Sequence, residues 1–191
     1  MPANGYHLET EWQVEGTVRE VYDVVSDDEH LTEWWPAAFL RCDLVAPGQP
    51  DGVGKTLRVV TKGWLPYTID WHQRVTETRE PYGLSIETWG DFAGRGVWTF
   101  AQHGPRVDAH FDWRIAADKP LLRYLSPLLK PLFAFNHRWA MARGEDGLKL
   151  ELLRRRATTP EARAAIPLPP GPTWPHRRAR AALDPATDAF A

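Results

Sequence analysis

KPLLRYLSPLLKPLFAFNHRWAMARGEDGLKLELLRRR, from Lys119 to Arg156, is predicted to form one long helix. Its apolar residues recur at the spacing of one helix face: Leu121, Leu125, Leu128, Leu132, Phe135, Trp139 and Ala142. Pro127 and Pro131 each remove a backbone donor, so we expect a short, kinked start and a straight run from Pro127 to about Arg155. A helix of this length needs a broad apolar surface to lie on.

The chain before this helix predicts one strand, two short helices and then a series of strands. Alternation marks a first strand at Tyr6–Val14. Thr17 and Glu20 form a capping box that opens a helix ending near Ser26, and a second short helical piece is expected at Glu29–Trp35. The later strands are expected at Phe39–Ala46, Lys55–Lys62, Tyr67–Arg79, Leu84–Asp91, Gly94–Gln102 and Arg106–Ala116. Because short turns join these strands, the sheet should be antiparallel.

Alternation along the strands gives this sheet one apolar and one charged face. In the last strand, Phe111 and Trp113 share a side, whereas Asp108, His110 and Asp112 share the other. Residues predicted on the inner face of the sheet include Tyr67, Trp71, Gln73, Thr88, Trp98, Phe111 and Trp113. The apolar face must be covered, and the long helix is the obvious cover.

Composition limits the class of protein. With 191 residues, of which 43% are hydrophobic and 25% charged, the chain can form one globular domain with a sizeable core. A net charge of -2 and a pI near 6.4 give no general attraction to nucleic acid. No apolar run approaches the roughly 20 residues of a membrane span, so no integral membrane association is expected. One cysteine, Cys42, excludes an internal disulfide, and no signal-peptide pattern is present, so we predict a cytoplasmic protein.

The composition changes after Arg156. Residues 157–191 are rich in Pro, Ala and Arg and have no apolar periodicity. We therefore predict a folded domain at 1–156 and a mostly disordered tail at 157–191. A docking segment for a partner protein is the alternative role of the tail.

The order of these elements resembles the helix-grip fold. Three segments, VEGTVREVYDVVSDDEHLTEWWP at 14–36, GDFAGRGVWTF at 90–100 and NHRWAMARGEDGLKLEL at 136–152, resemble the polyketide cyclase/dehydrase and lipid-transport branch of the START-like (SRPBCC) superfamily. The resemblance covers about Tyr6 to Arg156. It implies an α+β fold in which a curved antiparallel sheet of about six to seven strands wraps around the long C-terminal helix, with two short helices after the first strand. It also implies an elongated cavity between sheet and helix, which in this superfamily often holds a hydrophobic molecule.

The chain has ten tryptophans, and seven of them fall in predicted strands or short helices. One interpretation is a core that uses indoles as filler. The other is a cavity lined with indoles, because Trp offers a flat apolar wall and one N–H donor. The sequence leaves both open.

We predict a ligand site from the inward residues and the matching face of the helix. Its residues are Tyr67, Trp71, Gln73, Thr88, Trp98, Phe111, Trp113, Asn136 and Trp139. The set offers directional hydrogen bonds but no strong acid, base or nucleophile, so it indicates binding more than catalysis, and no catalytic residue is assigned. The alternative for each polar member is a buried group satisfied by a neighbour.

Other polar groups carry weaker signals. Asp70 and His72 share an outward face and are expected to form charge pairs across strands. A β-bulge at Gly94–Gly96 could turn Arg95 inward, where it would hold an anionic ligand head.

Metal and cofactor signals are missing from the sequence. His72, His110 and His137 do not have a ligand spacing, and Cys42 has no CxxC partner, so no metal site is predicted. No GxGxxG or P-loop occurs, so no cofactor is predicted.

Three functions remain open. The first is binding of an aromatic, polyketide-like or lipid-like small molecule. The second is an aromatase/cyclase-type enzyme, in which the cavity holds reacting carbons close and Tyr67, Gln73 or Arg95 polarises carbonyls. The third is an interaction module that uses the groove or the tail to hold another protein.

Overall fold

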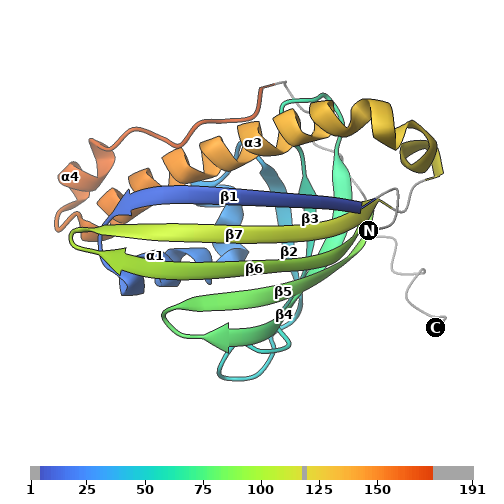
Figure 1. Ribbon diagram of the computed structural model, residues 1–191. Coiled ribbons are helices and arrows are strands. Elements are labelled where there is room, and N and C mark those ends of the chain that lie inside the picture. Colours follow the sequence, from blue (N-terminus) through green and yellow to red (C-terminus); the bar gives the residue numbers. More distant parts are fainter. Residues whose placement is uncertain (1–4, 118–119, 174–191) are drawn as a thin grey trace.

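A computed structural model describes the backbone of residues 5–117 and 120–173 and the side chains of residues 5–116 and 131–173. The described part of the chain is an α+β structure (Figure 1). Its strands are β1 (Gly5–Glu15), β2 (Phe39–Ala46), β3 (Thr56–Thr61), β4 (Ile69–Arg79), β5 (Gly83–Gly90), β6 (Phe92–His103) and β7 (Arg106–Ala117). Its helices are α1 (Val18–Val25), the 3-10 turn η1 (Asp28–His30), α2 (Leu31–Trp34), α3 (Pro120–Arg156) and α4 (Pro160–Ala164).

The strands form one antiparallel sheet in the order β1-β7-β6-β5-β4-β3-β2. Neighbours in sequence are neighbours in space except at β1, which pairs with β7 from Gly5 opposite Ala116 to Glu15 opposite Arg106. Figure 1 shows that the sheet is curved and that α3 runs along β1 across its open side. The predicted helix-grip fold is therefore confirmed.

The predicted elements match the observed ones closely. Every predicted strand end lies within two residues of the observed end, and the largest differences are at the starts of β4 and β6. The predicted helix at Glu29–Trp35 is η1 followed by α2. The backbone of α3 is helical from Pro120 onward, and Figure 1 shows its first turns set at an angle to the rest.

Helix α1 begins with the predicted capping box. Thr17 Oγ1 accepts a hydrogen bond from the Glu20 backbone N–H at 3.2 Å, and the Thr17 backbone N–H donates to Glu20 Oε2 at 2.8 Å. The Arg156 guanidinium, whose Nε lies 2.7 Å from Glu20 Oε1, lowers the pKa of Glu20 to about 2. This ion pair joins the start of α1 to the end of α3.

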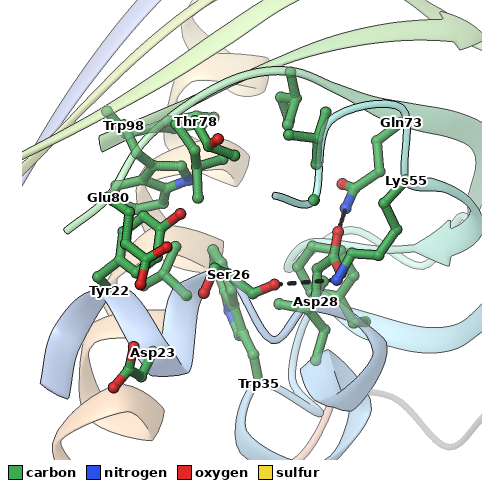
Figure 2. A pocket seen from close by; sticks show the side chains of 18 of the residues that line it. Tyr22, Asp23, Ser26, Asp28, Trp35, Lys55, Gln73, Thr78, Glu80 and Trp98 are labelled. Atoms are coloured by element: carbon green, nitrogen blue, oxygen red, sulfur yellow. Dashed lines mark hydrogen bonds and ion pairs between the residues drawn. The ribbon is translucent and has the colours of Figure 1, made fainter. Parts of the chain in front are cut away.

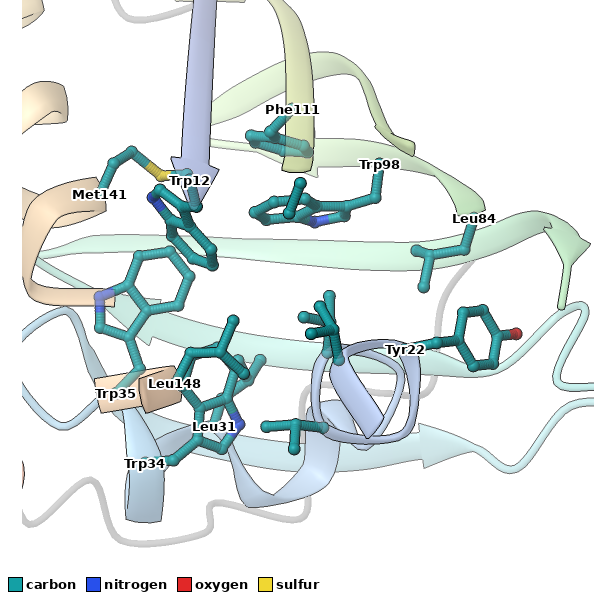
Figure 3. Close-up of a cluster of buried hydrophobic side chains, with 14 of the residues drawn as sticks. Trp12, Tyr22, Leu31, Trp34, Trp35, Leu84, Trp98, Phe111, Met141 and Leu148 are labelled. Atoms are coloured by element: carbon teal, nitrogen blue, oxygen red, sulfur yellow. The ribbon is translucent and has the colours of Figure 1, made fainter. Parts of the chain in front are cut away.

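Large apolar side chains pack between the sheet and the part of α3 around Met141 and Leu148 (Figure 3). Trp12 from β1 is almost fully buried and contacts the rings of Trp35 and Trp98 at centroid distances of 5.5 and 4.9 Å. Met141 and Leu148 of α3 are buried in the same cluster. Little room remains for a ligand beneath this part of α3.

Residues 157–173, the first part of the predicted tail, have defined positions. Thr159 caps α4 by accepting from the Ala162 N–H, and the chain then runs back alongside α3 (Figure 1). Arg154 donates to the Pro167 carbonyl, and Thr173 Oγ1 donates to the Trp64 carbonyl at 3.2 Å. Residues 174–191 lie outside the described part of the chain, and the 1–156 domain boundary stays a prediction.

Candidate functional site

A partly open cavity of about 300 Å³ lies between the inner face of the sheet and the short helices. The sheet side is formed by β2, β4, β5, β6 and β7, the other side by α1, η1 and α2, and the loop before β3 adds residues 50–52 and Lys55. No described residue of α3 lines it. This cavity therefore faces the short helices and not the C-terminal helix, where the sequence analysis placed it, while the cluster around Trp12 and Leu148 occupies the region under the part of α3 whose side chains the structure describes.

Indoles form much of the cavity wall. Trp34, Trp35, Trp71, Trp98 and Trp113 all line it. Trp98 stacks on Phe111 at 4.5 Å between ring centroids, and Trp113 meets both Phe111 and Trp71 edge-on. This arrangement favours the interpretation of the tryptophans as cavity walls, although Trp12 serves as core filler.

Gly96 of β6 makes room for the Phe111 ring. A Cβ atom at this position would lie 2.8 Å from Phe111 Cε2 and Cζ. The ring can therefore approach the β6 backbone closely and stack on Trp98. A continuous aromatic surface results on the sheet side of the cavity.

One end of the cavity carries a buried polar cluster (Figure 2). Lys55 Nζ lies 2.5 Å from Asp28 Oδ1 and donates to the Ser26 carbonyl at 3.2 Å. Gln73 Nε2 donates to Asp28 Oδ2 at 3.0 Å. Asp28 is only 6% exposed, and its burial raises the pKa of the carboxyl above its usual range, although Lys55 and Gln73 act in the opposite direction.

The mouth of the cavity carries carboxylates. Asp23, Asp51 and Glu80 belong to its lining. Arg19 bridges Asp23 and Glu80, whereas Asp51 Oδ1 accepts from the Val53 backbone N–H. Tyr22 stands beside them, and the pKa of its hydroxyl is raised, first by burial and then by the charge of Glu80. The mouth is therefore more negative than the interior, where Asp28 and Lys55 offset each other.

The structure brings five of the nine predicted site residues together around the cavity: Trp71, Gln73, Trp98, Phe111 and Trp113. Their contact with a ligand stays a prediction. They come from β4, β6 and β7 and face inward as the alternation predicted.

The other four predicted site residues do not line this cavity. Tyr67 precedes β4 and is 37% exposed, and Thr88 is buried farther along β5. Asn136 Oδ1 accepts from the Leu65 backbone N–H at 3.0 Å, which supports the alternative of a satisfied buried amide. Trp139 of α3 is half-buried and lies under the Arg143 guanidinium.

Two residues that the sequence analysis missed carry the polar chemistry of the cavity. Asp28 stands in the acidic run SDDEH, which is typical of a solvated helix start. Lys55 follows the turn PGQPDGVG and immediately precedes the apolar strand β3. The sequence offered one indication of this cluster: Lys55 is a lone cation between a glycine-rich turn and a buried strand.

The outward face of the sheet holds charge pairs, as expected. Arg58 makes two hydrogen bonds to Asp70, and His72 stacks on Trp89. The register of β6 with both neighbours is continuous through Gly94–Gly96, so the suggested bulge is absent there. Arg95 stays exposed on the outer face, and the suggestion that it holds a ligand head is wrong.

One group of described residues has the spacing of metal ligands, but its carboxylate is already paired with an arginine. The side chains of His7, Glu9 and Asp112 place a ligand atom each within 4.8 Å of one another. Both oxygens of Asp112, however, accept hydrogen bonds from Arg114, at 2.9 and 2.8 Å. The guanidinium already supplies the positive charge that a metal ion would bring, so we assign no metal here.

The fold has been observed in other proteins. A structure from Thermus thermophilus is 17% identical, with a TM-score of 0.62, over 80% of this chain and 100% of that one. The di-domain ARO/CYC BexL from the BE-7585A biosynthetic pathway is 15% identical, with a TM-score of 0.59, over 78% of this chain and 51% of its own. Norcoclaurine synthase from Thalictrum flavum, in complex with dopamine and hydroxybenzaldehyde, is 14% identical, with a TM-score of 0.55, over 81% of this chain and 90% of that one. At these identities the likeness concerns the fold.

The curved sheet, the long helix and the pocket together define a helix-grip protein of the START-like (SRPBCC) superfamily. A family model described as polyketide cyclase / dehydrase and lipid transport matches residues 6–156, and the chain belongs to that family. A search of curated proteins found no significant match. None of the described helices has an apolar stretch long enough to cross a bilayer. The cytoplasmic location stays a prediction.

Proposed function

We propose that this protein binds a flat, hydrophobic small molecule in the cavity between the sheet and the short helices. The observation that carries the proposal is a partly open, indole-walled cavity with one buried polar cluster at its end. A volume of about 300 Å³ suits a molecule of two or three fused rings, and small-molecule sites combine apolar walls with a few placed polar groups in this way. Membership of the family supports the proposal.

Lys55 is the group best placed to orient such a ligand. An ammonium has three donors, and among the described residues Nζ meets Asp28 Oδ1 and the Ser26 carbonyl. One donor is left for a carbonyl or hydroxyl oxygen of the ligand. The buried Gln73 amide fixes the far side of Asp28, so the cluster is ordered before a ligand arrives.

Filling the cavity should abolish binding without disturbing the outside of the sheet. Leu84→Trp adds an indole inside the cavity, because Leu84 lines it from β5. We expect the variant to bind naphthalene-2-methanol at least tenfold more weakly than the wild type, as measured by isothermal titration calorimetry. Leu44→Trp makes the same exchange on β2 at a side chain that is 48% exposed and outside the cavity, and it should bind as the wild type does. Equal binding by Leu84→Trp would argue against this cavity as the site.

A second candidate is an enzyme of the cyclase type, favoured by the buried Asp28–Lys55 pair. The Asp28 carboxylate could take a proton from a carbon next to a ligand carbonyl whose oxygen accepts from Lys55 Nζ. The resulting enolate carbon could then add to a second carbonyl of the same chain, whose oxygen takes the proton back from the Asp28 carboxyl. These roles replace those first considered for Tyr67 and Arg95, neither of which lines the cavity.

Asp28→Asn tests this second candidate because it keeps the shape of the side chain and removes the base. We expect cyclisation of a linear poly-β-keto thioester to slow about a hundredfold, with binding of naphthalene-2-methanol retained. Product formation can be followed by mass spectrometry. Wild-type protein that binds the probe but leaves the thioester unchanged would exclude the enzyme and leave the binding proposal standing.

A further inference from the structure

The described charges around the cavity are unequally distributed. Four acidic side chains line it, Asp23, Asp28, Asp51 and Glu80, against one basic side chain, Lys55. Lys55 is already in contact with Asp28. The interior pair is therefore close to neutral, and the excess negative charge lies at the mouth.

Arg19 only partly offsets the charge of the mouth. It is shared between Asp23, at 3.4 Å, and Glu80. Among the described residues, no cation forms an ion pair with the Asp51 carboxylate. Its Oδ1 accepts a hydrogen bond from the Val53 backbone N–H. Three carboxylates thus face one guanidinium. The raised pKa of the Tyr22 hydroxyl agrees with this excess of negative charge. Burial is its largest cause, and the charges of Glu80, Asp23 and Asp51 raise it further.

The apolar walls suit a cation as well. Figure 2 shows Glu80 and Tyr22 on the same side of the cavity as Trp98. The face of an indole ring attracts a positive charge, and a carboxylate nearby adds to that attraction. A ligand amine at the mouth would meet both groups while its rings lie against Trp98 and Phe111.

From this distribution we infer that the cavity selects aromatic molecules bearing a protonated amine, and that the amine lies at the mouth formed by Asp23, Asp51 and Glu80. This inference rests on the proposed function, since it names the class of ligand for the same cavity. It also disfavours fatty acids and other carboxylates: they would place a negative charge beside the three acidic groups, and Lys55 is already compensated by Asp28.

Three probes that share the naphthalene ring and differ in charge test the inference. They are 2-naphthylmethylamine, which is an ammonium at pH 7, the neutral naphthalene-2-methanol and the anion 2-naphthoate. We expect the ammonium to bind about tenfold tighter than the alcohol and the carboxylate to bind most weakly. Raising NaCl from about 0.02 M to about 0.5 M should reduce the ratio of ammonium to alcohol affinity, because the mouth is exposed to solvent.

A matched pair of double variants assigns the preference to the mouth. Asp51→Asn with Glu80→Gln should bring the ratio of ammonium to alcohol affinity close to one. Asp43→Asn with Glu77→Gln removes the same charge outside the cavity lining and should keep the wild-type ratio. The inference is overturned if the ammonium is not the tighter ligand, or if the mouth variant keeps the ratio. If the alcohol binds but the three probes show no preference for positive charge, the proposed function stands and only the inference fails. If none of the probes binds, both the proposed function and the inference are refuted.

Discussion

Gly147→Ala should destabilise the protein by about 3 kcal/mol, although the same change in an ordinary helix is stabilising by up to about 1 kcal/mol. A Cβ atom at Gly147 would lie 1.9 Å from the backbone carbonyl oxygen of Trp34. A backbone atom cannot turn aside as a side chain can, so α2 would have to move away from α3. That movement would disturb Trp34, which is 1% exposed and lines the cavity.

Urea denaturation followed by far-UV circular dichroism measures this loss. Gly171→Ala is the matched control, because no atom lies within 4 Å of the position that its Cβ would take. We expect it to change the free energy of unfolding by less than about 0.5 kcal/mol. Should Gly147→Ala prove as stable as the wild type, the close seating of α2 on α3 would be wrong.

Lys55→Met should cost about 3–5 kcal/mol at pH 7, because it leaves the Asp28 carboxylate buried without its counter-ion. The loss should depend on pH. Burial already raises the pKa of Asp28 in the folded state above that of the unfolded chain, and removing Lys55 raises it further. A carboxyl of this kind contributes stability that is fully present below its unfolded pKa and is lost as the pH rises through its folded pKa.

The difference in unfolding free energy between Lys55→Met and the wild type should therefore be largest at pH 7 and should shrink as the pH is lowered towards about 4. Urea titrations at both pH values measure it. Adding Asp28→Asn removes the titrating group and should recover part of the loss at pH 7. Lys149→Met breaks an exposed pair with Glu145 and should cost no more than about 1 kcal/mol at either pH. A deficit for Lys55→Met that is the same at both pH values would contradict the buried-carboxylate argument.

The sheet could be predicted from the sequence because side-chain alternation is a local signal. Alternation alone placed Trp71, Trp98 and Phe111 on the inner face, where the structure has them. The polar cluster could not be found in this way. Asp28 and Lys55 lie in a 3-10 turn and just after a loop, where no periodicity indicates which way a side chain points, and 27 positions of sequence separate them.

The position of the cavity was missed for a different reason. Two layers cover the sheet, α3 and the short helices, and both bury apolar side chains in the same core. Which layer leaves space depends on tertiary packing. Trp12 of β1 and Leu148 occupy the region under the described side chains of α3, and Gly144 lets α3 approach the Trp35 ring. From the sequence alone, this glycine indicates only a position of low helix propensity.

The pairing of β1 with β7 bears on how the protein is made. The closest pair in that ladder, Glu15 and Arg106, is separated by 91 positions, and the farthest, Gly5 and Ala116, by 111. A ribosome that adds about 5–20 residues per second needs roughly 5–20 s to cover that distance. Throughout this interval the nascent β1, with Trp12 and Val14 on it, lacks its native partner β7. Strand β1 thus waits longer for its partner than any other strand of this sheet, which makes it a natural substrate for chaperones that hold extended apolar segments.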